Sequence, residues 1–147
     1  MPRILIENRQ KTRRLNLTKL SRIASQILKL QGEKKAELSL VFVTNSQMAS
    51  LNKKYRLLSK PTDVLAFPMG EKKEKRRNVY PVGDVVISVE KALTQAREWG
   101  QPFEKELTRL LIHGCLHLFG FRDGKRPERI KMFRQQEKIL ALVYEAP

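Results

Sequence analysis

The chain of 147 residues is long enough to form one domain whose hydrophobic core needs neither disulfides nor a structural metal. It contains 30 Lys and Arg against 15 Asp and Glu, a formal net charge of +15. A single cysteine excludes an internal disulfide and fits a reducing compartment. No apolar run reaches the roughly 20 residues that cross a bilayer, and the first residues do not have the pattern of a signal peptide. We therefore expect a single-domain cytoplasmic protein with no membrane partner.

The positive charge is concentrated in the first part of the chain. Residues 1–60 carry 14 basic and 3 acidic side chains, whereas residues 61–147 carry 16 and 12. Ion pairing needs acids, and half of the basic residues have no acidic counterpart. A strong positive field attracts polyanions and is the electrostatic pattern expected of a nucleic-acid binder. We predict nucleic acid or the ribosome as the partner, with a membrane surface or a merely soluble surface as alternatives.

The first half of the chain alternates between strand and helix patterns. The predicted elements are a strand over residues 3–9, a helix from residue 16 or 18 to 30, a strand over residues 37–44 and a helix capped by Asn45 that runs to about Tyr55. Gly32 supplies the stop of the first helix. This alternation indicates an α/β fold.

The second half begins with a short apolar run between prolines. Residues 60–68 contain this run, and the prolines confine it to a sheet edge or an extended loop. Residues 71–78 form a charged loop, and residues 83–87 form a further strand. We expect three more helices: one capped by Ser88 and ending near Gly100, one opened by Pro102, and one starting near Pro127. The predicted fold is a single α/β domain with a small mixed sheet of about four strands and about five helices.

The only two histidines, His113 and His117, are four residues apart in the helix predicted after Pro102. Residues four apart lie on the same face of a helix, so both imidazoles can reach one point in space. Gly120 can end the helix and fold the chain back, which would bring in Asp123 as an oxygen ligand. Three protein ligands with one open position are typical of a catalytic metal. The sequence therefore predicts a metal site at His113, His117 and Asp123.

The rest of this helix is mostly apolar. Glu106, Arg109, His113 and His117 fall within about 60° of one another at 100° per residue, and apolar residues cover nearly all other directions. A buried polar stripe needs partners, which a metal or an anionic ligand would provide. The alternative is a solvated face that carries two ordinary histidines. Cys115 points away from the histidines, and we interpret it as a small buried hydrophobic residue.

Three blocks in residues 51–123 carry a family resemblance. Residues 113–123 read His-Gly-Cys-Leu-His-Leu-Phe-Gly-Phe-Arg-Asp, residues 51–68 include Asn-Lys-Lys-Tyr-Arg and Pro-Thr-Asp-Val-Leu-Ala-Phe-Pro, and residues 83–87 read Gly-Asp-Val-Val-Ile. In their order along the chain, these blocks resemble the motifs of the YbeY family, metal-dependent endoribonucleases that mature ribosomal RNA. That family has His-Gly-x-Leu-His-Leu-x-Gly-Tyr-x-His, Asn-x-x-Tyr-Arg, Pro-Thr-Asp-Val-Leu-Ser-Phe-Pro and Gly-Asp-Ile-x-Ile.

Two positions differ from the family pattern. Ala66 stands where the family usually has serine, and Asp123 stands where its third metal-binding histidine falls. Aspartate is a competent zinc ligand. Its charge would make bound water less acidic and would widen the choice of metal toward harder ions.

The resemblance implies a zinc-dependent endoribonuclease with a metzincin-like metal helix and one Zn²⁺ per chain. It implies a role in ribosomal RNA processing at the 3′ end of the small-subunit RNA and in ribosome quality control. The implied partners are ribosomal RNA and the ribosome or a ribosomal protein; the sequence leaves the oligomeric state open. In this hypothesis, Arg56 and His113 are the catalytic residues, and Arg56 binds the phosphate. The predicted RNA-binding residues are Lys53, Lys54, Arg56, Lys60, Lys72, Lys73, Lys75, Arg76 and Arg77.

Two other functions remain as alternatives. The spacing His-x3-His-x2-Gly-x2-Asp also resembles metzincin proteases, but their general base is a glutamate at the position of Gly114. A peptidase would therefore need a base from elsewhere. The second alternative is a non-enzymatic, ribosome-associated RNA-binding factor in which the metal only has a structural role. Few exposed-looking aromatic residues accompany the basic ones, so base stacking is not evident.

Overall fold

A four-stranded mixed β-sheet is the framework of the computed structural model, which describes residues 1–56, 63–69 and 79–144. The strands are β1 (Arg3–Asn8), β2 (Ala36–Val43), β3 (Val64–Pro68) and β4 (Tyr80–Ser88). The helices are α1 (Leu17–Leu30), α2 (Asn45–Arg56), α3 (Val89–Glu98), α4 (Phe103–Leu118) and α5 (Arg126–Val143). The predicted α/β class, with four strands and five helices in one domain, is confirmed for the described residues.

The strands lie in the order β1-β2-β4-β3. Strands β1, β2 and β4 are parallel to one another, and β3 pairs antiparallel with β4 at the edge of the sheet. This confirms the edge position expected from the prolines, because a proline cannot donate a backbone hydrogen bond to a second neighbouring strand. The pairing of β4 with β2 shifts in register between Glu37 and Leu38. Glu37 lies opposite Pro81, whereas Leu38 lies opposite Gly83. Gly83 has a φ of +143°, and a Cβ there would overlap the Phe67 carbonyl.

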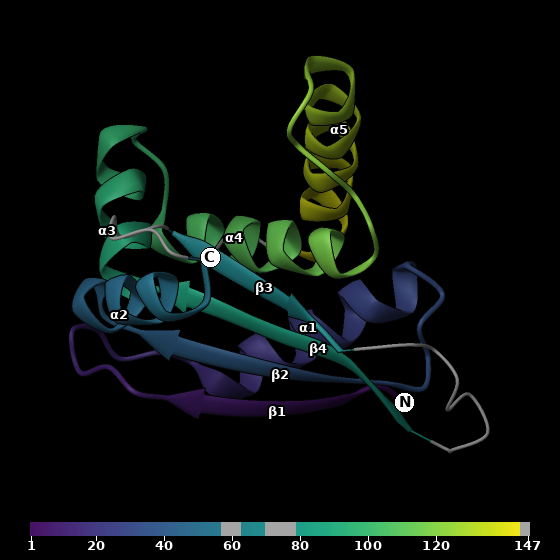
Figure 1. The fold of residues 1–147 in the computed structure, drawn as a ribbon, viewed down its shortest axis with the longest axis horizontal. Coiled ribbons are helices and arrows are strands. Elements are labelled where there is room, and N and C mark those ends of the chain that lie inside the picture. Colours follow the sequence, from purple (N-terminus) through teal and green to yellow (C-terminus); the bar gives the residue numbers. More distant parts are fainter. Residues whose placement is uncertain (57–62, 70–78, 145–147) are drawn as a thin grey trace.

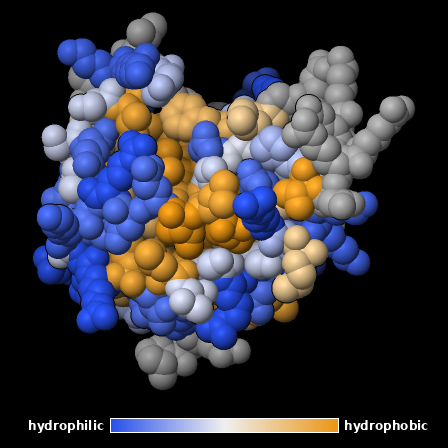
Figure 2. All heavy atoms as spheres, turned by 90° about the horizontal axis from the view of Figure 1, so that it is seen from below, coloured by the Kyte–Doolittle hydropathy of each residue, from blue (hydrophilic) through white to orange (hydrophobic). Residues whose placement is uncertain are grey.

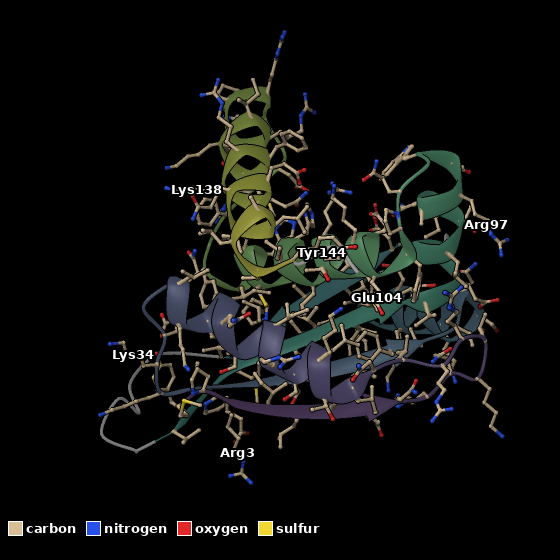
Figure 3. The ribbon with its side chains drawn as sticks, turned by 180° about the vertical axis from the view of Figure 1, so that it is seen from behind. Arg3, Lys34, Arg97, Glu104, Lys138 and Tyr144 are labelled. Atoms are coloured by element: carbon tan, nitrogen blue, oxygen red, sulfur yellow. The ribbon has the colours of Figure 1, made fainter. Side chains whose placement is uncertain are left out.

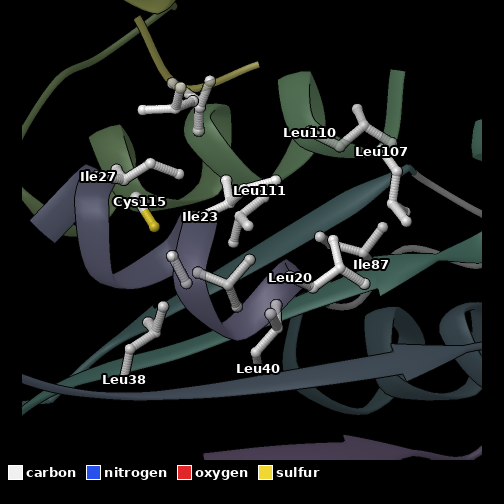
Figure 4. Close-up of a cluster of buried hydrophobic side chains, with 14 of the residues drawn as sticks. Leu20, Ile23, Ile27, Leu38, Leu40, Ile87, Leu107, Leu110, Leu111 and Cys115 are labelled. Atoms are coloured by element: carbon white, nitrogen blue, oxygen red, sulfur yellow. The ribbon is translucent and has the colours of Figure 1, made fainter. Parts of the chain in front are cut away.

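Helices cover both faces of the sheet (Figure 1). Helices α1 and α4 pack on one face of the sheet. Alternate residues of β4, such as Val85 and Ile87, point to this face and belong to the main core. Val86 points to the other face and packs with Met48 of α2 in a smaller cluster. Figure 4 shows the main core, in which side chains of β2 and β4 meet those of α1 and α4. Its labelled members are Leu20, Ile23, Ile27, Leu38, Leu40, Ile87, Leu107, Leu110, Leu111 and Cys115.

Helix α5 stands away from the sheet and contacts it through α4 and α1 (Figures 1 and 3). Its inner face buries Met132, Ile139 and Leu140, whereas Lys138 extends into solvent. Gln136 is buried among the apolar residues of this inner face. Helix α5 therefore packs as an outer layer on the helix that carries the histidines.

Apolar side chains also remain on the outer surface. Figure 2, seen from below, shows apolar atoms gathered among hydrophilic ones. The large exposed apolar residues of β1 and α1 are Leu5, Leu17 and Leu30. Among the described residues, no helix is both long and apolar enough to span a membrane.

Most helix ends follow the predicted capping residues. The Ser88 side chain accepts a hydrogen bond from the Lys91 N–H and caps α3, and Gly32 adopts a φ of +77° after α1. The predicted cap of α2 is wrong by one residue. Thr44 Oγ1 accepts from the Gln47 N–H at 3.2 Å, while the Gln47 side chain accepts from the Thr44 N–H at 2.9 Å. Such a reciprocal pair satisfies two backbone donors, which a cap at Asn45 would not do.

Helix α4 approaches the sheet closely at Gly114. A Cβ at this position would lie 2.6 Å from Cγ1 of Val85 and 3.1 Å from Cγ2 of Val64. Val85 is fully buried and β-branched, so its side chain has little freedom to rotate away. The absence of a side chain at position 114 therefore sets the distance between α4 and the sheet.

We expect Gly114→Ala to lower the free energy of unfolding by about 1–2 kcal/mol, because the new methyl group overlaps Val85. Helix propensity alone predicts the opposite sign, a gain of about 1 kcal/mol. Urea denaturation of Gly114→Ala, Val85→Ala and the double variant measures both effects. The double variant should lose less than the two single losses together, by at least about 0.5 kcal/mol. A stabilised Gly114→Ala protein, or strict additivity, would contradict this packing.

Candidate metal centre

His113 and His117 stand on one face of α4 with their imidazoles turned toward each other. The two Nε2 atoms are 3.1 Å apart, and both side chains are half-buried. Asp123 reaches the same point from the turn after α4. Its Oδ2 lies 3.4 Å from Nε2 of His117 and 3.6 Å from Nε2 of His113. The structure thus brings together the three residues that the sequence predicted as metal ligands.

The turn that delivers Asp123 depends on Gly120. This residue has a φ of +93°, which closes the helix in a left-handed conformation. The Gly120 N–H bonds to the carbonyl of His117, and the Phe121 N–H bonds to that of Leu116 at 3.0 Å. This pair of bonds is a Schellman motif, which satisfies carbonyls at the end of the helix and reverses the chain. The predicted stop at Gly120 is confirmed.

The same turn also orients His117. Its Nδ1 lies 3.0 Å from the carbonyl oxygen of Phe121. A backbone carbonyl can only accept, so Nδ1 carries the proton and Nε2 keeps a free lone pair. His113 has a similar contact, with Nδ1 2.8 Å from Oε1 of Gln136 on α5. Gln136 was not predicted as a site residue.

The spacing of the three donor atoms fits a four-coordinate metal ion. Ligand bonds of about 2.0–2.1 Å in a tetrahedral arrangement place neighbouring donor atoms about 3.3–3.4 Å apart. The observed separations of 3.1, 3.4 and 3.6 Å surround this value. Two neutral imidazoles and one carboxylate also match the nitrogen and oxygen ligands typical of zinc sites. The donor set can therefore hold a divalent cation and leave one position open.

The three ligands line a groove of about 690 Å³. Its walls come from β3, from the end of α4 with the following turn, and from Asn52 of α2. Ala66 of β3 lies in this wall, where the family usually has serine, so the wall has no hydroxyl at that position. Arg122 also lines the groove, although the sequence did not identify it as a site residue. Its position next to Asp123 in the sequence could have indicated that Arg122 lies near the metal site.

The polar stripe of α4 continues away from the histidines as an ion-pair network. Arg109 donates to Glu106 at 3.0 Å and, through Nε and a terminal nitrogen, to Glu137 of α5 at 3.0 and 3.1 Å. The Glu106 side chain is only 1% exposed. The predicted stripe is therefore polar, largely buried and satisfied by partners. Glu106 and Arg109, the first half of the stripe, are satisfied by ion pairs with each other and with α5 rather than by a metal.

Burial and ion pairing act in opposite directions on these carboxyl groups. Burial raises the pKa of Glu106 above its usual value, against the attraction of Arg109. Burial also opposes ionisation of Glu137, but the hydrogen bonds from Arg109 and Gln136 outweigh it and lower its pKa. The hydrogen bond to Glu137 in turn raises the pKa of Arg109. At neutral pH, Glu137 is therefore a carboxylate that accepts hydrogen bonds.

Cys115 has no role in the metal site. Its side chain is fully buried in the core, and burial raises the pKa of its thiol to about 12. Cysteine acts as a ligand or nucleophile in its thiolate form, which this environment suppresses. The interpretation of Cys115 as a small buried hydrophobic residue is consistent with the structure.

The predicted basic residues are only partly described. Lys53 and Lys54 are exposed on α2, and Lys54 Nζ lies 5.1 Å from the centre of the Tyr55 ring. Tyr55 is itself 57% exposed, so one aromatic residue accompanies these basic ones. Arg56 is the last residue of α2, and its side chain is outside the described structure. The other predicted RNA-binding residues fall outside the described ranges: Lys60, Lys72, Lys73, Lys75, Arg76 and Arg77.

The position of the metzincin glutamate, Gly114 in this chain, has no room for a glutamate side chain in this fold. A Cβ at Gly114 would point into Val85 and Val64 of the sheet rather than into the groove. A general base at this position is thus excluded by packing as well as by sequence.

Comparison with known proteins identifies one family. A family model described as "Endoribonuclease YbeY" matches residues 5–143. Relatives with the same name include the following three. One from Thermoanaerobacter sp. (strain X514) is 39% identical, covering 94% of this chain and 95% of its own length. One from Aquifex aeolicus is 40% identical, covering 88% and 85%. One from Syntrophotalea carbinolica is 36% identical, covering 99% and 98%.

A solved structure shares the fold. The solution structure of a protein from Thermotoga maritima matches with a TM-score of 0.65 at 28% identity, covering 97% of this chain and 89% of that one. The family model and the relatives extend over nearly the whole chain, and the residues of the site fall within the matched range. The chain belongs to the YbeY endoribonuclease family.

Proposed function

We propose that this protein is a metal-dependent endoribonuclease that processes ribosomal RNA in the cytoplasm. The observation that carries the proposal is the convergence of Nε2 of His113, Nε2 of His117 and Oδ2 of Asp123 on one point in an open groove. The relatives named endoribonuclease YbeY support RNA as the substrate. A net charge of +15 also favours a polyanion.

We propose zinc as the metal, with one ion per chain. Two imidazoles, one carboxylate and an open position form a donor set typical of catalytic zinc. Such an ion, when bound, supplies a Lewis acid for an oxygen of water or phosphate. The carboxylate of Asp123 also suits harder ions such as Mn²⁺, which elemental analysis distinguishes from zinc.

We propose that His113 is both a ligand and a catalytic residue, and that Arg56 binds the scissile phosphate. Arg56 stands four residues after Asn52, the α2 residue that lines the groove, and this helical spacing supports a role in the same groove. A guanidinium can bind two phosphate oxygens and stabilise the charge that develops on them. Arg122, which lines the groove, offers a second cation.

The remaining basic residues would hold the RNA backbone. Lys53 and Lys54 are exposed on the helix that contributes to the groove, and Tyr55 offers a ring for stacking. We keep the predicted lysines and arginines of residues 60–77 in this role. The family resemblance further favours the 3′ end of small-subunit RNA as the substrate and the ribosome or a ribosomal protein as a partner, in processing and quality control.

A peptidase function is not favoured, because no side chain fits at position 114 to act as the base. A ribosome-associated factor with a structural metal would share the site but would not turn over RNA. RNA cleavage therefore distinguishes an endoribonuclease from a ribosome-associated factor with a structural metal.

Purified protein should contain about one zinc ion per chain by elemental analysis. His117→Ala should lose this metal, because it removes one of three donors. Asp123→Asn should bind zinc more weakly, since a neutral amide is a poorer ligand. Glu98→Gln, which changes an exposed acid of α3, is the matched control and should keep full occupancy. Stoichiometric metal in His117→Ala would remove that residue from the site.

Metal-loaded, nuclease-free protein should cleave a structured ribosomal RNA fragment, and His113→Ala should reduce the rate by about 10³-fold or more through loss of the ion. Circular dichroism should show that the variant keeps its fold. Casein should remain uncut. Cleavage that persists unchanged in His113→Ala would contradict the proposal.

Arg56→Ala should lower kcat/KM for RNA by about 10²-fold while zinc content stays the same. Arg56→Lys should recover only part of this loss, because lysine keeps the charge but not the two-point contact. Arg97→Ala, an exposed arginine of α3, serves as the matched control. Equal effects of Arg56→Ala and Arg97→Ala would show that Arg56 only adds to the general positive charge.

A further inference from the structure

We propose that Gln136 of α5 is a positioning residue that fixes the tautomer of His113 and thereby keeps its Nε2 lone pair free for the metal. This inference rests on the proposed metal site. Gln136 is only 6% exposed, and its Oε1 lies 2.8 Å from Nδ1 of His113. The contact joins α4 to α5, and its two residues are 23 positions apart in the sequence. Nothing in the ligand motif itself specifies it.

The orientation of the Gln136 amide decides what His113 can do. A glutamine side chain can present either its oxygen or its NH₂ group to an imidazole, and each choice demands a different tautomer. Here the Gln136 Nε2 lies 3.3 Å from Oε2 of Glu137, which as a carboxylate can only accept. The NH₂ group is therefore turned to Glu137 and the oxygen to His113. His113 must then donate from Nδ1, which leaves Nε2 unprotonated.

Glu137 is itself held in place by the ion-pair network of α4. Arg109 donates to both of its carboxylate oxygens, at 3.0 and 3.1 Å, and to buried Glu106 at 3.0 Å. A bidentate arginine fixes the plane of a carboxylate as well as its distance. A continuous chain of contacts thus runs from Glu106 through Arg109, Glu137 and Gln136 to His113. Through these contacts, the ion pairs of Glu106 and Arg109 help to orient the imidazole of His113.

The two histidines differ in how their tautomers are set. His117 donates to the backbone carbonyl of Phe121, which cannot be changed by a side-chain substitution. His113 depends on a side chain supplied by another helix. Without the Gln136 oxygen, His113 can carry its proton on Nε2, and that form cannot bind the metal. Loss of such an outer contact typically weakens metal binding by about 10–100-fold.

Two readouts test the role of Gln136. In metal-free protein, ¹⁵N NMR of the imidazoles at a pH where histidine is neutral should show His113 protonated at Nδ1. Gln136→Met, which keeps the length but lacks the acceptor, should raise the fraction protonated at Nε2. In a chelator competition, the same variant should bind zinc about 10–100-fold more weakly than the unchanged protein. Gln136→Glu keeps an acceptor oxygen and should retain most of the affinity.

Gln135→Met is the matched control, because this neighbouring glutamine is half-buried and makes no side-chain hydrogen bond within the described parts of the chain. It should change neither readout. Folded Gln136→Met protein with unchanged tautomer and zinc affinity would overturn the inference. If Gln136→Met does not fold, Glu137→Gln takes its place. It removes the charge that orients the amide and should also raise the Nε2-protonated fraction of His113; an unchanged fraction would overturn the inference.

Failure of the metal site itself would look different. If the unchanged protein binds no zinc or other divalent ion, the proposed metal site is wrong. The NMR measurement needs no metal, so it still decides whether Gln136 sets the tautomer of His113.

Discussion

The close contact between α4 and the sheet at Gly114 is the constraint on which the site depends. Because no side chain separates the helix from Val85 and Val64, the apolar faces of α4 are buried in the core and its polar stripe is turned toward β3 and α5. The same contact places His113 and His117 in the wall of a groove shared with β3. Packing of one glycine thus determines both how the core closes and where the metal ligands stand.

The polar stripe shows how a mostly buried helix can carry functional side chains. Burial of Glu106 is tolerated because Arg109 pairs with it, and Arg109 also pairs with Glu137. His113 and His117 instead direct their free nitrogens to the groove, where Asp123 meets them. Helix α5 serves both halves, since it supplies Glu137 to the ion pairs and Gln136 to His113. Stability and ligand geometry are therefore coupled through one helix–helix interface.

Local rules in the sequence account for most of the fold and for the three candidate ligands. The spacing of the histidines, the stop at Gly120 and the prolines around β3 act within a few residues, so they can be recognised without a structure. Gln136 and Arg122 were not recognised, because their roles depend on contacts between separate elements. One local signal for Gln136 existed: it interrupts the apolar stripe of Met132, Ile139 and Leu140. A polar residue on a buried stripe requires a partner, but only the structure identifies it as His113.

In the proposed site, two imidazoles of α4 and Asp123 hold one metal ion. X-ray absorption spectroscopy of the zinc-loaded protein reports on this set of ligands, because imidazole rings produce a characteristic multiple-scattering pattern. The predicted shell contains two imidazole nitrogens at about 2.0–2.1 Å and at least one oxygen at about 2.0–2.2 Å. His117→Ala should remove one imidazole contribution from any metal that remains. A shell without imidazole scattering, or with sulfur at about 2.3 Å, would contradict this site.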